Sequence, residues 1–453
     1  MDSDKVNNVS KPRPTRSDHG PQTATALRAL DLFSGAGGMS CGFEWMGGVV
    51  CGGIDNDASA AATFQRNHPD AKVWAEDIRK LDARQVHDAV GDVDVILGGP
   101  MCQGVSQRGP RDPRDARNFA FWAFAQYIRE FRPRYFLMEN VPALASDVHN
   151  RRLAIAVFEE LESLGYHLAA DVVNAAWLGV PQLRHRCVVM GGLAAQPRFP
   201  NPVARGIAGQ FVESEFITVD DAIMDLPVVA AGGGSDDAPL VDSRAPLSIY
   251  AMQMRAGADR LHNHWSADTD NINLDRINLV PEGGNWHDVP PHLLPARFQE
   301  VRPSDHTTTY GRLHRGHPSY TITTECGNVT SGAYTHPTQH RAITVREAAR
   351  LQGFPDRFAF CGPRGAQYKQ VGNAVPPLMA RRLLESLLLG RDASDFVGRL
   401  SASVLAKYPR ERLPFTLAPR YRPLFGRSTG AARRSAAQME LPATASATGT
   451  SRG

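Results

Sequence analysis

The stretch that decides the fold is Asp31-Leu32-Phe33-Ser34-Gly35-Ala36-Gly37-Gly38. It ends an apolar run, ALRALDLF at 26–33, and precedes a helical segment, MSCGFEWMG at 39–47. Glycines let the backbone approach a ligand closely, and the first turn of a helix offers free N–H groups to that ligand. A tight structural turn also explains so short a glycine pattern. Whether this is a ligand-binding loop or a structural turn therefore depends on the neighbouring sequence.

The same alternation of short apolar runs and amphipathic segments continues to about residue 191. The apolar runs are continuous rather than alternating, which is typical of parallel strands buried on both faces. We therefore predict an α/β fold with a doubly wound sheet. The segments concerned are GGVVCGGID at 47–55, SAAATFQRN at 59–67, VDVILGG at 93–99, FAFWAFAQYIREF at 119–131 and RYFLMENV at 134–141.

Between 192 and 335 the apolar periodicity weakens, and Gly, Pro, Asn and Asp become frequent. Nine of the fifteen histidines lie between His262 and His340. We predict a second, smaller, loop-rich domain at 192–335, inserted into an α/β domain that occupies 28–191 and is completed by helices at 336–390. Residues 1–27 read as a flexible tail and 391–453 as an extension that is flexible from about 429.

Composition narrows the class of protein. The 453 residues include 50 Lys and Arg against 47 Asp and Glu, so the formal net charge is +3 and any nucleic-acid site must be a local patch. We find no apolar run of about 18 residues, which excludes a transmembrane helix. Six cysteines without a CxxC pair fit a reducing compartment, so we expect a cytoplasmic protein.

Carboxylates stand where successive apolar runs end. Asp55 follows the second run and Asp77 follows the next, as expected for residues that hydrogen-bond the ribose of a nucleoside-bearing cofactor at the carboxyl edge of a sheet. For Asp77, a helix N-cap is an alternative interpretation. Glu139 ends a further apolar run and is either an N-cap or a general acid.

Cys102 lies in the loop Gly98–Ser106 after another apolar run. A lone cysteine is most often a small buried apolar residue, but glycines and several arginines surround this one, and nearby positive charge favours a thiolate. Farther on, Gln182-Leu183-Arg184-His185-Arg186 precedes an apolar run and, if it forms a strand, presents three polar side chains on one side.

In this order, these motifs resemble those of the DNA (cytosine-5) methyltransferase family. DLFSGAGG resembles its first cofactor motif, GPMCQGVS its nucleophile loop, ENV its glutamate motif and QLRHR its QxRxR motif. TVREAARLQGFPD and QVGNAVPP, after the insert, resemble its two C-terminal motifs. The resemblance spans about residues 28–385 and implies an S-adenosylmethionine-dependent, Rossmann-like catalytic domain.

The resemblance implies a role for each matching residue. Cys102 would be the nucleophile toward cytosine C6, Glu139 would act at N3, and Arg184 and Arg186 would hold the O2 side. Base flipping would make a cytosine in double-stranded DNA accessible, and 192–335 would recognise its sequence. Residues implied in DNA binding are Gln103, Ser106, Gln107 and Arg108, with Arg111, Arg114 and Arg117 behind them. Residues implied in binding S-adenosylmethionine are Phe33, Gly35, Gly37, Asp55, Asn56, Asp77, Ile78, Pro100, Asn373 and Ala374.

Met101 departs from the family pattern, which has proline directly before the nucleophile. One alternative is therefore a DNA-binding homologue with weakened or lost catalysis, and a second is an RNA cytosine methyltransferase, against which the long insert argues. A third is a zinc protein built on His314 and His317 or on His336 and His340, but no cysteine pair completes four ligands, and we predict no metal. We expect a monomer, with a cognate restriction endonuclease as a possible partner.

Overall fold

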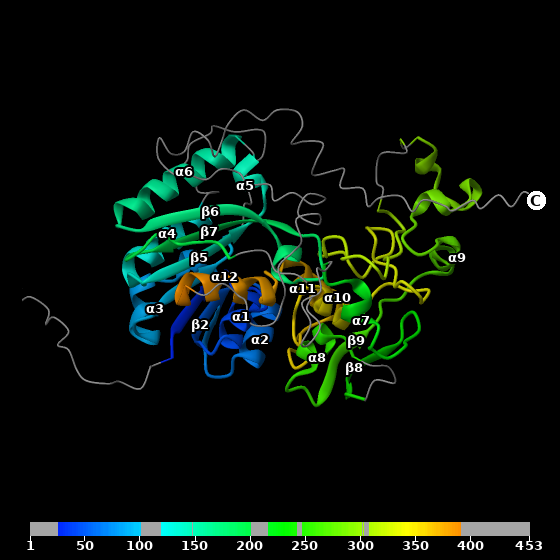
Figure 1. Cartoon of the computed structure of the whole chain (residues 1–453), viewed down its shortest axis with the longest axis horizontal. Coiled ribbons are helices and arrows are strands. Elements are labelled where there is room, and N and C mark those ends of the chain that lie inside the picture. The colour runs from blue at the N-terminus through cyan, green and yellow to red at the C-terminus, as the bar shows by residue number, and fades with distance from the viewer. Residues whose placement is uncertain are drawn as a thin grey trace, which may run out of the picture.

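The structure is a computed structural model that describes residues 26–100, 119–146, 148–200, 216–241, 247–300, 302 and 308–390. Its centre is a seven-stranded sheet with the strand order β3-β2-β1-β4-β5-β7-β6 (Figure 1). The strands are β1 Arg28–Leu32, β2 Val49–Asp55, β3 Lys72–Ala75, β4 Val95–Gly98, β5 Tyr135–Asn140, β6 His167–Asn174 and β7 His185–Gly192.

Both faces of this sheet are buried, as the continuous apolar runs predict. In β4, Val95 and Leu97 belong to one hydrophobic cluster while Ile96 belongs to the other, because successive side chains point to opposite faces of a strand. The surrounding helices are α1 Gly38–Trp45, α2 Ala58–Asn67, η1 Ile78–Lys80, α3 Ala83–Val90, α4 Phe119–Phe131, α5 Ala143–Ser146, α6 Val148–Ser163 and η3 Ala175–Leu178.

The predicted parallel arrangement is correct only for β1 to β5. Strand β7 lies between β5 and β6 and runs antiparallel to both, so the sheet is mixed. Only residues 175–184 connect β6 to β7, which favours an antiparallel pair, whereas parallel neighbours need a long crossover. Burial on both faces produces the same continuous apolar run in either direction, so the residue pattern does not reveal strand direction.

Residues 216–300 contain only short elements (Figure 1). Tyr250, Met254 and Trp265 join the same hydrophobic cluster as the C-terminal helices, while Trp286 and Phe298 belong to a separate small cluster. The elements are α7 Val219–Ile223, β8 Gly234–Pro239, α8 Ile249–Arg255, β9 Arg260–Trp265, α9 Asn271–Leu279, η4 Trp286–Asp288, η5 Pro291–Leu293 and η6 Ala296–Gln299.

Three helices end the described chain: α10 Val345–Leu351, α11 Arg364–Asn373 and α12 Pro377–Leu389. Helix α12 packs against α1, so the last helix covers the first motif of the chain. The approach is close at Gly38, where a Cβ would lie 2.2 Å from the Val375 carbonyl oxygen. Within the part of the chain that the structure describes, we find no helix whose length and apolar character match a membrane crossing.

Candidate active site

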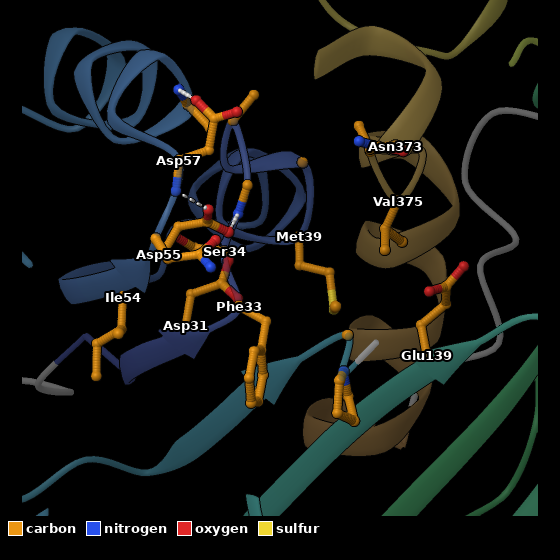
Figure 2. Close-up of a pocket in the computed structure, with 18 of the residues that line it drawn as sticks. Asp31, Phe33, Ser34, Met39, Ile54, Asp55, Asp57, Glu139, Asn373 and Val375 are labelled. Carbon is orange, nitrogen blue, oxygen red and sulfur yellow. Dashed lines mark hydrogen bonds between the residues drawn. The ribbon is translucent and has the colours of Figure 1, made fainter. Parts of the chain in front are cut away.

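A cavity of about 720 Å³ lies at the carboxyl ends of β1, β2, β4 and β5 and is closed by the connection from α11 to α12 (Figure 2). This is the edge at which open α/β sheets bind their ligands. Gly37 does not line the cavity. The predicted residues that do line it are Phe33, Gly35, Asp55, Asn56, Asp77, Ile78, Pro100, Glu139, Arg184, Arg186, Asn373 and Ala374.

The glycine-rich loop turns sharply between β1 and α1. Gly35 has φ +53° and Gly37 has φ +94°, a left-handed conformation that costs glycine little. A Cβ on Gly37 would also lie 2.7 Å from His68 Nε2, so this glycine makes room for the packing of α2 rather than for the cavity. The loop motif therefore serves two purposes, one toward the cavity and one toward the core.

Asp55, at the end of β2, is fixed by the backbone on both sides. One carboxylate oxygen accepts a 2.8 Å hydrogen bond from the Gly35 N–H, and the other accepts a 2.9 Å bond from the Asp57 N–H (Figure 2). Burial raises the pKa of this carboxyl, and the two N–H donors oppose that rise. Each carboxylate oxygen can accept a further hydrogen bond, so Asp55 can still hold a hydroxyl in the cavity.

Asp77 has a different local role. Its side chain accepts a 3.0 Å hydrogen bond from the Arg79 N–H and so caps η1, as the alternative interpretation of this residue predicts. The Arg79 guanidinium contacts the same carboxylate and lowers its pKa to about 2. Asp77 therefore borders the cavity as a helix-capping carboxylate that is also paired with Arg79.

The other end of the cavity holds Glu139 and Arg186, whose Nε lies 2.8 Å from a carboxylate oxygen. Both side chains are largely buried, with exposed fractions of 12% and 15%. They meet because β7 is antiparallel to β5: β7 begins where β5 ends, and Asn140 pairs with Cys187. Burial raises the pKa of Glu139, while Arg186 and Arg184 oppose this rise.

The QLRHR segment does not act as one strand face. Strand β7 begins at His185, so Gln182 and Arg184 precede it, and the suggested alternation of three side chains along a strand is wrong. Arg184 is 2% exposed and donates to the carbonyl oxygens of Ile322, Gly372 and Ala374. Its guanidinium thus reaches two segments that are more than a hundred residues away in sequence.

The structure describes the chain up to Pro100 and again from Phe119, so the loop that contains Cys102 lies outside the described residues. The Pro100 carbonyl oxygen accepts a 2.6 Å hydrogen bond from Asn140 Nδ2, so the entrance to the loop is fixed. Sequence reasoning gave Asn140 no role, although it lies in the quoted ENV motif, and also missed Glu76 and Lys369 in the cavity wall. Predicted residues outside the described ranges are Met101, Cys102, Gln103, Ser106, Gln107, Arg108, Arg111, Arg114 and Arg117.

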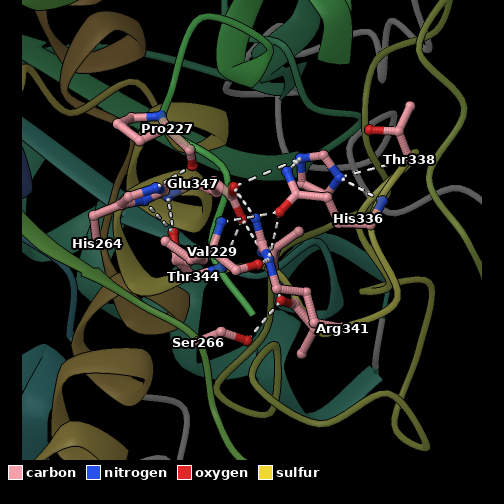
Figure 3. Close-up of polar contacts among 12 residues, drawn as sticks. Pro227, Val229, His264, Ser266, His336, Thr338, Arg341, Thr344 and Glu347 are labelled. Carbon is pink, nitrogen blue, oxygen red and sulfur yellow. Dashed lines mark hydrogen bonds and ion pairs between the residues drawn. The ribbon is translucent and has the colours of Figure 1, made fainter. Parts of the chain in front are cut away.

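The histidines of the zinc-protein alternative contact protein side chains. His336 is buried and lies 3.6 Å from Glu347, which is bonded through both carboxylate oxygens to Arg341 (Figure 3). The rings of His314 and His317 pack on each other, with centroids 4.3 Å apart. Among the described residues, no group of three or more His, Cys, Asp or Glu side chains is placed to hold a metal ion.

Comparison with known proteins identifies the family to which this chain belongs. The family model for C-5 cytosine-specific DNA methylases matches residues 27–388. The type II methyltransferase M.DdeI of Desulfomicrobium norvegicum is 34% identical over 378 residues, covering 80% of this chain and 88% of that protein. M1.HphI of Haemophilus parahaemolyticus, also a type II methyltransferase, is 34% identical over 370 residues, with 80% and 87% covered.

A solved structure supports the same family assignment. The crystal structure of a prophage-encoded E. coli protein described as a DNA modification methyltransferase superposes with a TM-score of 0.60 at 25% identity, covering 81% of this chain and all of the other. The chain belongs to the C-5 cytosine-specific DNA methylase family. It is an enzyme of the DNA (cytosine-5-)-methyltransferase class, as the resemblance of its motifs predicts.

Proposed function

We propose that this enzyme transfers a methyl group from S-adenosylmethionine to C5 of a cytosine that is flipped out of a specific double-stranded DNA sequence. The observation that carries the proposal is one cavity lined both by Asp55 and by the Glu139–Arg186 pair, with Asn373 also in its wall. Figure 2 shows Asp55 and Glu139 on opposite sides of the view, with Asn373 on the side of Glu139. One end suits a pyrimidine ring and the other a nucleoside. Pro100, which leads directly to Cys102, lies in the same cavity wall.

The residues at the nucleoside end fit S-adenosylmethionine. Asp55 would accept hydrogen bonds from ribose hydroxyls, and Phe33 would lie against the adenine. Asp77 and Ile78 would border the adenine, while Asn373, the last residue of α11, would close the site. When bound, S-adenosylmethionine supplies a methyl group on a positively charged sulfonium, which attracts an electron-rich carbon. We propose that the residues predicted from the sequence to bind S-adenosylmethionine do so, except that Gly37 would act through its packing against His68.

The residues at the pyrimidine end would make C5 of cytosine electron-rich. The Cys102 thiolate would add to C6, forming an S–C bond and moving the ring electrons toward C5. Burial favours a protonated Glu139, which would donate a hydrogen bond to N3 and so stabilise the negative charge that develops in the ring. Arg186 would stabilise the O2 side. Once C5 carries the methyl group, loss of the C5 proton to a base would expel the cysteine by β-elimination.

Recognition of DNA would require the target base to leave the helix stack. Gln103, Ser106, Gln107 and Arg108 would fill the vacated position and contact phosphates, with Arg111, Arg114 and Arg117 as further phosphate contacts. Residues 192–335 would read base edges in the major groove, since they lie between the two parts of the catalytic sequence. We propose a monomeric enzyme that acts in the cytoplasm, on the nucleoid.

M.DdeI and M1.HphI are named type II methyltransferases, so we propose a role in restriction and modification, with a cognate endonuclease as partner. Neither an RNA methyltransferase nor a non-catalytic DNA-binding homologue is favoured, since the family match covers both parts of the catalytic sequence. Met101 is compatible with activity because Asn140 fixes the preceding carbonyl at Pro100.

Bisulfite sequencing of DNA from a host that expresses the chain tests the proposal. We expect protected cytosines in one sequence context, and their absence from every context would contradict it. DNA that contains 5-fluorocytosine adds a test of the covalent step. Fluorine does not leave C5 as a cation, so a denaturation-resistant adduct should form with the wild type and not with Cys102→Ser.

Exchanging residues 192–335 for the corresponding insert of a relative with another target site tests the recognition role. We expect the methylated sequence to change to that of the donor while methylation itself continues. Methylation of the original sequence by the chimera would place recognition elsewhere, most simply in the loop after Cys102.

A further inference from the structure

The two arginines of QLRHR have different surroundings. Arg186 contacts Glu139 at the pyrimidine end of the cavity. Arg184 uses three of its five N–H groups on backbone carbonyls: Nη1 lies 2.8 Å from the Ile322 oxygen, and Nη2 lies 3.0 and 3.1 Å from the oxygens of Gly372 and Ala374. The residue between these last two carbonyls is Asn373, which lines the cavity.

Neighbouring side chains strengthen the same arrangement. Gln352 Nε2 donates to the carbonyls of Val371 and Ala374, both at 2.9 Å, so Ala374 is held twice. Gln182 Oε1 accepts a 2.8 Å hydrogen bond from the Ile322 N–H, while Arg184 holds the carbonyl of the same residue. Both polar groups of the Ile322 backbone are therefore bound by the QLRHR segment.

We infer that Arg184 is a positioning residue that holds the C-terminal end of α11, from Gly372 to its C-cap Ala374, in the wall of the cavity. It thereby sets the affinity for S-adenosylmethionine rather than contacting cytosine. A guanidinium suits this task because its rigid, planar fork reaches several carbonyls at once, whereas an ammonium group acts as a point charge. The inference rests on the proposed function, since it assumes that S-adenosylmethionine occupies this cavity.

The central experiment measures binding of S-adenosylmethionine and of S-adenosylhomocysteine to the full chain by isothermal titration calorimetry. Arg184→Lys keeps the charge but does not span three carbonyls, so we expect its Kd to rise at least tenfold. Gln352→Met removes the other support of Ala374 while leaving the arginine in place, and we expect a smaller rise in the same direction. If Arg184→Lys fails to fold, Gln352→Met decides the question.

Two controls separate this role from catalysis and from general stability. Arg186→Lys should lose methylation while keeping the wild-type Kd for S-adenosylmethionine. Arg346 matches Arg184 as a buried arginine that donates to three backbone carbonyls, those of His262, Pro355 and Phe358, but it does not line the cavity. Arg346→Lys should therefore lower the Tm without changing the cofactor Kd.

A wild-type Kd in Arg184→Lys would overturn the inference, as would an equal loss of affinity in Arg346→Lys. If the wild type binds and methylates while Arg184→Lys binds equally well, only the positioning role fails. If the wild type itself binds no S-adenosylmethionine, the proposed function fails and this inference fails with it.

Discussion

The two ends of the cavity present carboxylates in opposite ways. At the proposed nucleoside end, Asp55 is held by two backbone N–H groups and Asp77 by the Arg79 side chain, and each partner lies no more than twenty residues away along the chain. At the proposed pyrimidine end, Glu139 is paired with Arg186, which lies 47 residues later on a strand that runs the opposite way. Contacts close in sequence hold the carboxylates Asp55 and Asp77, whereas a long-range contact holds the carboxylate at the end proposed for chemistry.

This difference in construction has an electrostatic counterpart. Arg79 lowers the pKa of Asp77 to about 2, so this carboxylate stays charged. Burial raises the pKa of Glu139 despite the nearby arginines, and favours its protonated form. A strand-end carboxylate is therefore a fixed acceptor at one end and a candidate proton donor at the other. Variants at the two ends should separate binding from chemistry.

The largest expected effect is that of Cys102→Ser. A hydroxyl is a far weaker nucleophile than a thiolate, so methylation should become undetectable while S-adenosylmethionine and DNA still bind. Single-turnover transfer of a radioactive methyl group measures the loss. The half-buried, free Cys361 offers a control, and Cys361→Ser should keep the wild-type rate. Wild-type turnover by Cys102→Ser would exclude it as the nucleophile.

Glu139→Gln should have the next largest effect. Loss of a general acid lowers a rate by about 10²–10⁴-fold, and the amide should leave the Kd for S-adenosylmethionine unchanged because the substitution is at the other end of the cavity. Quenched single-turnover assays measure the methylation rate, and calorimetry measures the Kd for S-adenosylmethionine. A variant that loses cofactor affinity but keeps its rate would reverse the roles of the two ends.

The pH dependence of single-turnover methylation sharpens the same assignment. If the protonated Glu139 is the active form, as proposed, its contribution should fall as pH rises through a pKa that lies above the ordinary glutamate value. Glu139→Gln cannot ionise and should lack this fall. An identical alkaline decline in both proteins would assign the titration to another group.

Asp55→Asn should act on binding. An amide loses the charge and one acceptor, so the hydrogen bond from either Gly35 or Asp57 is weakened along with contacts to the ribose. We expect a rise in the S-adenosylmethionine Kd of about tenfold, equal to ~1.4 kcal/mol, with little change in the rate at saturating cofactor. Asp77→Asn is the matched comparison, and its effect on Kd should be smaller, because Asp77 is already paired with Arg79.

The smallest effect is expected for Met101→Pro. Proline would restrict φ to about −65° and stiffen the nucleophile loop, so the single-turnover rate should be equal or higher and the DNA Kd nearly unchanged. Measurements at saturating cofactor and DNA compare the two forms. A tenfold slower proline form with normal DNA binding would show that methionine is an adapted part of the loop.

The sequence predicted the local features of this molecule well. The apolar runs that became β1, β2, β4 and β5 lie where their patterns place them, and Asp55 and Glu139 stand at strand ends. The direction of β7 was not predictable, because burial on both faces gives the same apolar run in either direction. The distinct surroundings of Arg184 and Arg186 depend on partners such as Ile322, more than a hundred residues away, and a motif alone does not contain them.

The packing of α12 on α1 has a consequence for the synthesis of this enzyme. Gly38 meets Val375, and Thr63 is hydrogen-bonded to Gln370, 307 residues later. A chain growing from the ribosome contains the glycine loop and Asp55 long before it contains the residues that close the cavity above them. We therefore expect the cavity to remain open in unfinished chains. Only a chain of about 390 residues, which includes α12, should bind the cofactor and methylate DNA.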